Sequence, residues 1–274
     1  MEIYAKIIED SISKDNKRIT TMQIHFPKCL TAEFNTHRVF SRNFSSSRAI
    51  PVSKLTEIDS FYPLYYGENQ SGMQAKKTEI ENVSEAEKIW LDAIEYCKNA
   101  SLKLSELGLH KQWSNRLNDW HTMSTGIVTS TEWNNFFMLR DHPDAQPEIQ
   151  ELAIKMKEAI NSSIPKLLNY GEWHLPYVTK VERETIELSD LKKISAARCC
   201  RVSYLKQDGT NPSIEDDLKL FNRLAGAIPK HYSPLEHQAT PCVSFLDGIY
   251  SGNFKGWVQF RRLDESTTYN KETL

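Results

Sequence analysis

Glycine-rich nucleotide-binding motifs are missing from this chain of 274 residues. It contains only 10 glycines, and neither the GxGxxG pattern of dinucleotide-binding crevices nor the GxxxxGK[S/T] phosphate loop occurs. The GxSxG turn of serine hydrolases and the HExxH helix of zinc proteases are absent as well. A nucleotide, if one is bound, must therefore be held by separate side chains.

An excess of charge of one sign is also missing. The 34 Lys and Arg residues nearly balance the 36 Asp and Glu residues, which leaves a formal charge of −2. No basic block is present, so we expect no stable binding to nucleic acid. No apolar run approaches the roughly 20 residues that span a bilayer, and the N-terminal segment lacks the pattern of a signal peptide. We expect a cytoplasmic protein that does not bind membranes.

Cysteine pairs are absent too. The five cysteines form no CxxC pattern and no spacing typical of zinc sites, so neither a disulfide framework nor a metal site is expected. Cys242 follows Pro241, a pair also found around some catalytic nucleophiles, but the pair alone is weak evidence. We interpret all five as packed or surface thiols.

Hydrophobic periodicity predicts a mixed α and β chain. Alternation over 3–11 and 18–26 predicts an N-terminal β-hairpin. Helical spacing predicts one helix over 84–108 and another that begins near Pro147. Residues 52–83 form an irregular, aromatic-rich segment of the kind that is functional or mobile.

The last third of the chain is expected to contain two helices and a strand-like tail. The predicted helices cover 189–204 and 213–227. Three cap patterns predict helix starts, namely Ser84 with Glu87, Ser189 alone, and Ser213 with Asp216. The tail is predicted as strand-like through Val243, Phe245 and Phe260. Residues 166–188 interrupt the helical pattern and form a candidate junction.

The densest polar cluster covers residues 35–48, with the sequence NTHRVFSRNFSSSR. It contains three arginines, whose guanidinium groups match phosphate oxygens, and four serines that add hydroxyl donors. This composition suits a phosphate site. The alternative is a solvated polar loop, because Ser and Asn are common turn residues.

The cluster resembles the signature of the flavin-dependent thymidylate synthases, in which Arg-His-Arg is followed at fixed spacing by Ser, Asn-Glu, Ser and Arg. The matching residues are His37, Arg38, Ser41, Asn43, Ser46 and Arg48. Thr36 stands in place of the first Arg, and Phe44 in place of the Glu. Three further segments resemble elements of the same family: 135–149 (which includes Asn135 and Arg140), 201–204 (Arg-Val-Ser-Tyr) and 231–237 (His-Tyr-Ser-Pro-Leu-Glu-His).

The order of these elements differs from that of the family, where the last two precede the Arg-His-Arg motif. We interpret this as a circular permutation in a phage-type variant. Residues 1–165 would then correspond to the C-terminal part of the family fold and 189–274 to its N-terminal part, with 166–188 as the junction within one domain. Residues 254–262 resemble the strand that leads into the motif, and we hypothesise that Arg261 or Arg262 replaces the guanidinium missing at Thr36.

The resemblance implies an α+β fold with an antiparallel sheet flanked by helices, assembled as a homotetramer in a bacterial cell or a phage-infected host. It implies reductive methylation of dUMP to dTMP with FAD, NADPH and methylenetetrahydrofolate. Ser46, Arg48, Arg140 and Arg116 would bind the nucleotide, and Ser46 and Arg140 would also be catalytic. The residues implied in cofactor binding are His37, Arg38, Asn43, Asn135, Ser203, His231, Ser233 and Glu236.

Two departures from the family pattern leave other functions open. Phe44 removes a carboxylate, and Ala49 stands where the family usually has Tyr. One alternative is a related enzyme that modifies another pyrimidine nucleotide, for example by hydroxymethylation. The other is a non-catalytic protein of the same fold that binds a nucleotide or RNA.

Overall fold

The computed structural model describes residues 2–74, 76–202, 210–243 and 248–272. The expected roles of Ser203 and Phe245 therefore lie outside the described residues, as does the predicted helix end at Tyr204.

The predicted N-terminal hairpin is confirmed. Strands β1 (Tyr4–Ser13) and β2 (Arg18–Pro27) pair antiparallel, and the turn between them contains Asn16 at a positive φ of 56°. Asn tolerates this conformation better than most residues because its short side chain bonds locally. The apolar residues of β2 at Met22, Ile24 and Phe26 are fully buried on one face, as the alternation requires.

The hairpin forms the centre of a five-stranded sheet with the order β3-β4-β2-β1-β5. Strands β3 (Ser41–Phe44) and β4 (Met123–Ser130) extend it antiparallel, whereas β5 (Lys166–Leu168) joins β1 in parallel. Two short strands, β6 (Ala239–Pro241) and β7 (Trp257–Gln259), pair separately. The expected sheet is thus mostly antiparallel, with one parallel edge strand from the segment predicted as a junction.

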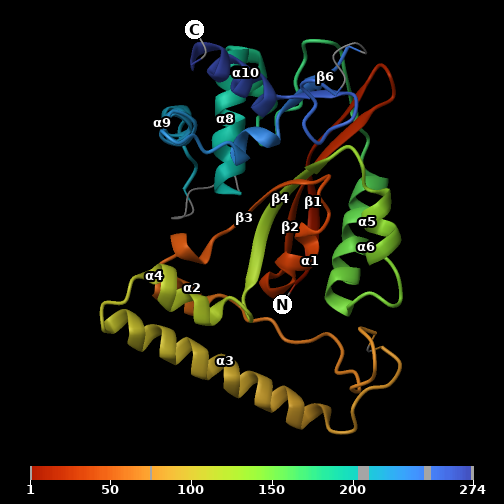
Figure 1. Ribbon diagram of the computed structural model, residues 1–274, viewed down its shortest axis with the longest axis vertical. Coiled ribbons are helices and arrows are strands. Elements are labelled where there is room, and N and C mark those ends of the chain that lie inside the picture. Colours follow the sequence, from red (N-terminus) through yellow and green to blue (C-terminus); the bar gives the residue numbers. More distant parts are fainter. Residues whose placement is uncertain (1, 75, 203–209, 244–247, 273–274) are drawn as a thin grey trace.

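Helices flank the sheet, so the predicted α+β class is confirmed (Figure 1). Helices α5 (Asn134–Arg140) and α6 (Pro147–Ser162) lie along one side, where α6 buries Ile149, Leu152 and Met156 in the main core. Helix α8 (Leu188–Arg201) meets the sheet through Cys199, which packs with Ile127 of β4. The remaining helices of this half are α7 (Lys180–Thr185), α9 (Ile214–Ala225) and α10 (Phe260–Glu272).

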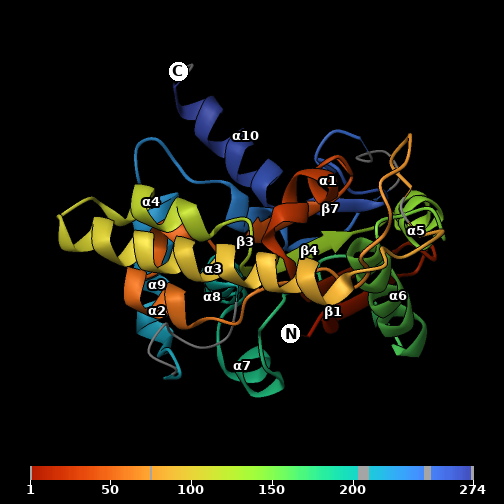
Figure 2. The same cartoon turned by 90° about the horizontal axis from the view of Figure 1, so that it is seen from below.

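A long helix, α3 (Val83–Glu106), lies at the end of the molecule opposite α8 and α10 (Figure 1), and the view from below shows it crossing in front of the other elements (Figure 2). It packs with α2 (Val52–Glu57) and α4 (Lys111–Ser114). The other short elements are α1 (Thr31–Asn35) and four 3-10 helices, Lys28–Leu30, Ser47–Ala49, Asn115–Asn118 and Ser233–Glu236.

Two of the three predicted helix caps are wrong. The helix expected from Ser84 begins at Val83 after Asn82, and the helix expected from Ser189 begins at Leu188 after Glu187, so both serines lie inside the first turn. Neither helix has a side-chain cap bond. The Ser213–Asp216 capping box of α9 is confirmed, with both reciprocal bonds present.

The strand-like tail is also partly wrong. Strand β7 ends at Gln259, and Phe260 begins α10 instead of continuing the strand. The start of α10 packs through apolar side chains: the ring of Phe260 lies edge-on to that of Trp173, 5.9 Å between centroids, and Leu263 packs on the same cluster. Tertiary packing therefore decides the structure of this short apolar run, as is common where periodicity is ambiguous.

A buried chain of hydrogen bonds ties the C-terminal half to the sheet. His174 bonds to Ser11 through Nδ1 at 2.9 Å and to Thr21 through Nε2 at 2.7 Å. Thr21 bonds to Thr129 at 2.7 Å, and Thr129 bonds to Nδ1 of His237 at 2.8 Å. All five side chains are fully buried. This hydrogen-bond network therefore fixes His237, and the residues 233–236 that precede it, against β4.

Candidate functional site

Arg38 lies between two cavities that the motif residues surround. The first cavity has a volume of about 630 Å³, and the second has about 420 Å³. Arg38 lines both. Its side chain comes from the turn between α1 and β3, a tight bend in which the backbone N–H of Phe40 donates to the carbonyl of His37 at 3.2 Å.

The first cavity contains three of the residues expected to bind cofactor, His37, Arg38 and Asn135. Its opposite wall is formed by α6, which contributes Lys157 and Asn161. Two further residues of the wall, Trp133 and Phe137, stack with 6.2 Å between ring centroids. The cavity thus combines aromatic faces with amide and cationic groups, which suits a ring system with polar edges.

His37 and Arg140 are joined directly. Nε of Arg140 donates to Nε2 of His37 at 3.2 Å, so the proton of the neutral imidazole sits on Nδ1. Burial lowers the pKa of His37, and the charges of Arg140 and Arg42 lower it further. His37 is therefore a neutral, buried acceptor that orients Arg140, and its ring lies edge-on to Phe136 at 4.9 Å.

The second cavity is strongly basic. Four arginines line it against a single carboxylate, that of Glu236; they are Arg38, Arg42, Arg261 and Arg262. Arg261 forms ion pairs with Glu236 and, at 2.8 Å, with Glu265, and its guanidinium lies over the ring of Tyr232 at 5.3 Å. Burial lowers the pKa of Arg42. Such a set of guanidinium groups favours a ligand with more than one negative charge.

Beside the second cavity, polar side chains from the C-terminal half form hydrogen bonds to the motif residues 39–41. Nε2 of Gln259 donates to Oγ of Ser41 at 3.2 Å and to Oδ1 of Asn253 at 2.9 Å. Nδ2 of Asn253 donates to the carbonyl of Val39 at 2.8 Å. Asn253 and Gln259 were missed at the sequence level, although Gln259 lies within the strand that resembles the one before the motif. Arg42 was inside the polar cluster but matched no family position.

The other expected cofactor residues are spread over this region. The 3-10 helix Ser233–Glu236 packs against β3, and its Glu236 lines the second cavity. His231 and Ser233 are exposed and line neither cavity. Nδ2 of Asn43 is buried and has no hydrogen-bond partner among the described residues. An unsatisfied buried donor of this kind is costly unless a ligand accepts from it.

The residues expected to bind the nucleotide are not gathered in one place in a single chain. Arg140 contacts His37, whereas Ser46 and Arg48 lie past the other end of β3. There Nε of Arg48 is 3.5 Å from Oγ of Ser46. The side-chain amide of Asn115 donates to the backbone carbonyls of Ser47 and Ile50, which lie on the two sides of Arg48 in the sequence. Arg116 is exposed and pairs with Asp119 at 2.7 Å. None of Ser46, Arg48 and Arg116 lines the two cavities.

Among the residues that the structure describes, no group of three or more His, Cys, Asp and Glu side chains is placed to hold a metal ion. In the same part of the chain, no helix has the length and apolar character needed to cross a membrane.

A family model described as thymidylate synthase complementing protein matches residues 18–166. No curated protein matches the sequence. Among solved structures, the UMP/dUMP methylase PolB from Streptomyces cacaoi, bound with 5-Br dUMP, is 14% identical, with a TM-score of 0.49 over 58% of this chain and 90% of the other. The flavin-dependent thymidylate synthase ThyX from Helicobacter pylori, complexed with FAD and dUMP, is 19% identical, with a TM-score of 0.37 over 52% and 67%. Both TM-scores lie below 0.5, so the family match rests on the sequence model.

Proposed function

Because the chain belongs to the thymidylate synthase complementing protein family, we propose that it is a cytoplasmic enzyme that methylates dUMP to dTMP. In this proposal FAD is the bound cofactor, NADPH supplies the reducing equivalents, and methylenetetrahydrofolate supplies the one-carbon unit.

The observation that carries the proposal is the meeting of distant motif segments at Arg38. The two cavities that share this arginine are lined from the motif loop by 36–40 and Arg42, from the α5 region by 131–137, and from the C-terminal part by Glu236, Gln259, Arg261 and Arg262. They include residues of four segments whose sequences resemble elements of the flavin-dependent synthases. Chance matches scattered over a sequence have no reason to converge in space.

The residues present fit a flavin dinucleotide. The arginines of the second cavity suit a pyrophosphate, and the aromatic and amide groups of the first suit a ring with polar edges. Asn43 lines neither cavity, so its unpartnered Nδ2 is a proposed donor only outside these two walls. Arg38, Arg42 and Asn135 are the residues proposed to hold the cofactor, with Glu236 holding Arg261 in place. When bound, the flavin would supply hydride transfer.

We propose that Arg261 or Arg262 takes over the role of the arginine replaced by Thr36. Both lie in the first turn of α10, which follows β7 directly, and both line the basic cavity together with Arg38. This arrangement supports the circular permutation, since the segment that resembles the strand before the motif lies beside the motif itself. It also supports one domain, because the halves 1–165 and 189–274 share this cavity.

Nucleotide binding is proposed for Arg140, Arg48, Ser46 and Arg116. Arg140 is oriented by the neutral His37 and can donate its remaining N–H groups to a phosphate. Arg140 reaches the first cavity through His37, whereas Ser46 and Arg48 lie past the other end of β3. We therefore propose that a complete nucleotide site combines Arg140 of one subunit with Ser46 and Arg48 of another, in a homotetramer. We also propose that His231, Ser233 and Ser203 contact the cofactor.

A second candidate substrate follows from Phe44. The carboxylate of the family pattern is replaced by a ring that packs on Phe26 and Phe34 in the core. The loss of one hydrogen-bonding group is enough to change which exocyclic group of a pyrimidine is accepted. A related reaction on another pyrimidine nucleotide, such as hydroxymethylation, is therefore the alternative to dUMP methylation.

The test is the visible absorption spectrum of the purified chain before and after addition of FAD. We expect a stoichiometric flavin spectrum that bleaches with NADPH once dUMP is present, followed by formation of dTMP. Product analysis with dUMP and dCMP, each with methylenetetrahydrofolate, separates methylation from hydroxymethylation. A colourless protein that does not oxidise NADPH would instead indicate a non-catalytic nucleotide- or RNA-binding protein.

Variants locate the cofactor within the basic cavity. Arg261→Ala and Arg262→Ala should weaken FAD binding by about tenfold or more for whichever residue contacts the pyrophosphate. Arg223→Ala, which removes an exposed arginine of α9, is the matched control and should leave the FAD affinity unchanged. Equal FAD affinities in all three variants would remove these arginines from the cofactor site.

A further inference from the structure

The turn that carries Arg48 rests on the segment that follows α3. The 3-10 helix Ser47–Ala49, which comes directly after β3 and Ser46, packs against α4. Helix α4 packs in turn against α3, and Figure 1 shows it at the C-terminal end of that helix, on the side of the chain that leaves β3. The turn is therefore supported from a distant part of the sequence.

Asn115 makes the central contact of this support. Its side chain is fully buried, and its Nδ2 donates to the backbone carbonyl of Ser47 at 2.7 Å and to that of Ile50 at 2.9 Å. Nζ of Lys111 donates to the backbone carbonyl of Ala49 at 3.2 Å. Three carbonyls of the turn thus accept from one segment, and a single amide supplies two of the three bonds.

Asn115 occupies its position for the sake of these two donors. Its Oδ1 is buried and has no hydrogen-bond partner among the described residues. An unpaired buried acceptor costs free energy, which an apolar side chain of similar size would avoid. The two bonds from Nδ2 to the turn offset this cost, so the amide is explained by what it holds.

The guanidinium of Arg48 is not fixed by its own contacts. The side chain is exposed, and among the described residues its one hydrogen bond is the long contact of 3.5 Å between its Nε and Oγ of Ser46. A long, mobile side chain loses less free energy on binding when its backbone is already in place. The reach and direction of Arg48 therefore depend on the backbone of the turn, which Asn115 holds.

Asn115 is anchored to α3 in its turn. Oγ of Ser101, a residue of α3, donates to the backbone carbonyl of Ser114 at 2.8 Å, and the side chains of Ser101, Ser114 and Asn115 are all fully buried. The next residue, Arg116, is exposed. One packed unit thus presents Arg116 and supports Arg48, two of the residues proposed to bind the nucleotide.

On the basis of the proposed function, in which Arg48 completes the nucleotide site of another subunit, we infer that Asn115 is a positioning residue for that site. Its amide holds the turn 47–50 so that the guanidinium of Arg48 meets the nucleotide phosphate. Asn115 itself touches no substrate. None of the segments that resemble the flavin-dependent synthases includes it. A displacement of about 1 Å in a binding group can cost up to about a hundredfold, so the support of the turn matters for affinity.

A double-mutant cycle tests the role of Asn115, with the affinity of the full chain for dUMP measured by isothermal titration calorimetry. We expect Asn115→Ala to weaken dUMP binding by about tenfold, and Arg48→Ala by about tenfold or more. The double variant should bind dUMP about as weakly as Arg48→Ala alone, because Asn115 acts through Arg48. Deoxyuridine, which has no phosphate, should bind to Asn115→Ala as it does to the unchanged chain. Losses that add in the double variant would overturn the positioning role.

Asn118→Ala is the matched control. Asn118 lies in the same 3-10 helix, Asn115–Asn118, and is also fully buried, but its Oδ1 accepts from Nε2 of His121 at 3.0 Å. This variant should lose stability in urea denaturation and keep its dUMP affinity within about twofold. Equal losses of dUMP affinity in Asn115→Ala and Asn118→Ala would mean that Asn115 serves the fold alone.

Ser101→Ala keeps the test decisive if Asn115→Ala does not fold. It removes the bond from α3 to the carbonyl before Asn115 and leaves every charge in place, so it should weaken dUMP binding by about threefold, and only while Arg48 is present. If Arg48→Ala weakens dUMP binding but neither Asn115→Ala nor Ser101→Ala does, the positioning role is wrong and the proposed function stands. If Arg48→Ala binds dUMP as the unchanged chain does, the nucleotide site of the proposed function is wrong and the positioning role fails with it.

Discussion

The ring of Phe44 lies directly over Gly126. The two residues are partners across the β3–β4 ladder, and a Cβ placed on Gly126 would come within 2.1 Å of Cδ1 of Phe44. The glycine thus leaves room for an aromatic ring that also packs against Phe26 and Phe34. Phe44, which stands where the family pattern has a carboxylate, is half-buried and packs against the main core.

Gly126→Ala should therefore destabilise the fold by about 1–3 kcal/mol through overpacking. In the double variant with Phe44→Leu the clash is relieved, so the two effects should couple by more than about 0.5 kcal/mol in a double-mutant cycle measured by urea denaturation. Strict additivity of the two substitutions would contradict the contact. Phe44→Glu, which restores the family residue, should be more destabilising than Phe44→Leu because its charge meets two aromatic rings.

A second prediction concerns the buried ion cluster between α8 and α9. Asp217 is fully buried and pairs with Nε of Arg198 at 2.7 Å and also with Arg201. Asp217→Ala removes one of the two described carboxylates that pair with Arg198, which is itself 1% exposed, the other being Glu182. The loss should cost about 3–5 kcal/mol of unfolding free energy.

Glu215→Ala on the same turn of α9 is the control for Asp217→Ala. Its pair with Lys219 is exposed on both sides, so the change should be within about 0.5 kcal/mol. Chemical denaturation measures both variants. Similar losses of unfolding free energy in Asp217→Ala and Glu215→Ala would mean that the buried cluster contributes no more to stability than a surface ion pair.

The third prediction is a loss of stability in mild acid from the buried chain between His174 and His237. Burial lowers the pKa of His237 to about 3 and holds that of His174 well below 6.5. In the unfolded chain both rings take up protons below about pH 6.5, whereas in the folded chain they do not. The stabilisation that comes from keeping these two histidines neutral is therefore fully present above pH 6.5. The unfolding free energy falls as the pH drops toward 3, by up to about 1.4 kcal/mol per histidine and pH unit.

Denaturation at pH 7.5, 6.0 and 5.0 measures this slope. His237→Gln should flatten it, and His142→Gln, at an exposed position, should not. An unchanged slope in His237→Gln would show that His237 takes up protons equally in both states.

Much of the fold followed from the sequence where local signals agree with packing. The hairpin alternation, the stripe of Ile149, Leu152 and Met156, and the Ser213–Asp216 cap all correspond to what the structure contains. The helix start predicted at Ser189 was wrong because α8 begins one residue earlier, after Glu187. It has no side-chain cap bond, and packing stabilises it instead. Phe260 misled because a short apolar run has no decisive period, and its burial against Trp173 selects a helix.

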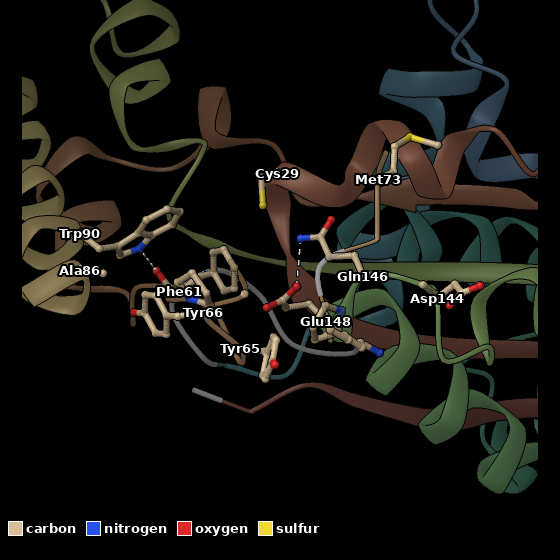
Figure 3. Close-up of a pocket in the computed structure, with 15 residues that line it drawn as sticks. Cys29, Phe61, Tyr65, Tyr66, Met73, Ala86, Trp90, Asp144, Gln146 and Glu148 are labelled. Carbon is tan, nitrogen blue, oxygen red and sulfur yellow. Dashed lines mark hydrogen bonds between the residues drawn. The ribbon is translucent and has the colours of Figure 1, made fainter. Parts of the chain in front are cut away.

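The site was predicted only in part, for a different reason. Motif spacing identified His37, Arg38 and Asn135, which meet in one cavity, but spacing carries no information about which distant segments join them. Asn253 and Gln259 act through long-range bonds to Val39 and Ser41 that no local pattern encodes. The aromatic residues after Phe61 gave a composition without a partner, and the cavity that they line (Figure 3) is completed by residues 144–148, which the sequence places about seventy residues away.

The last prediction follows from the bond between Arg140 and His37. The charge of Arg140 is, after burial, the largest influence that lowers the pKa of His37. Arg140→Ala should therefore raise this pKa, while burial still keeps it below 6.5, as measured by NMR titration of the imidazole. The same variant should weaken dUMP binding by about 10- to 100-fold if Arg140 donates to the nucleotide phosphate.

Arg140→Lys should keep the pKa of His37 lowered but lose much of the affinity for dUMP. An ammonium lacks the planar fork with which a guanidinium can bond to His37 and to a phosphate at the same time. Lys155→Ala, an exposed cation of α6, should change neither quantity. A rise in the His37 pKa without loss of dUMP affinity would leave Arg140 as the orienting partner of His37 and remove it from the nucleotide site.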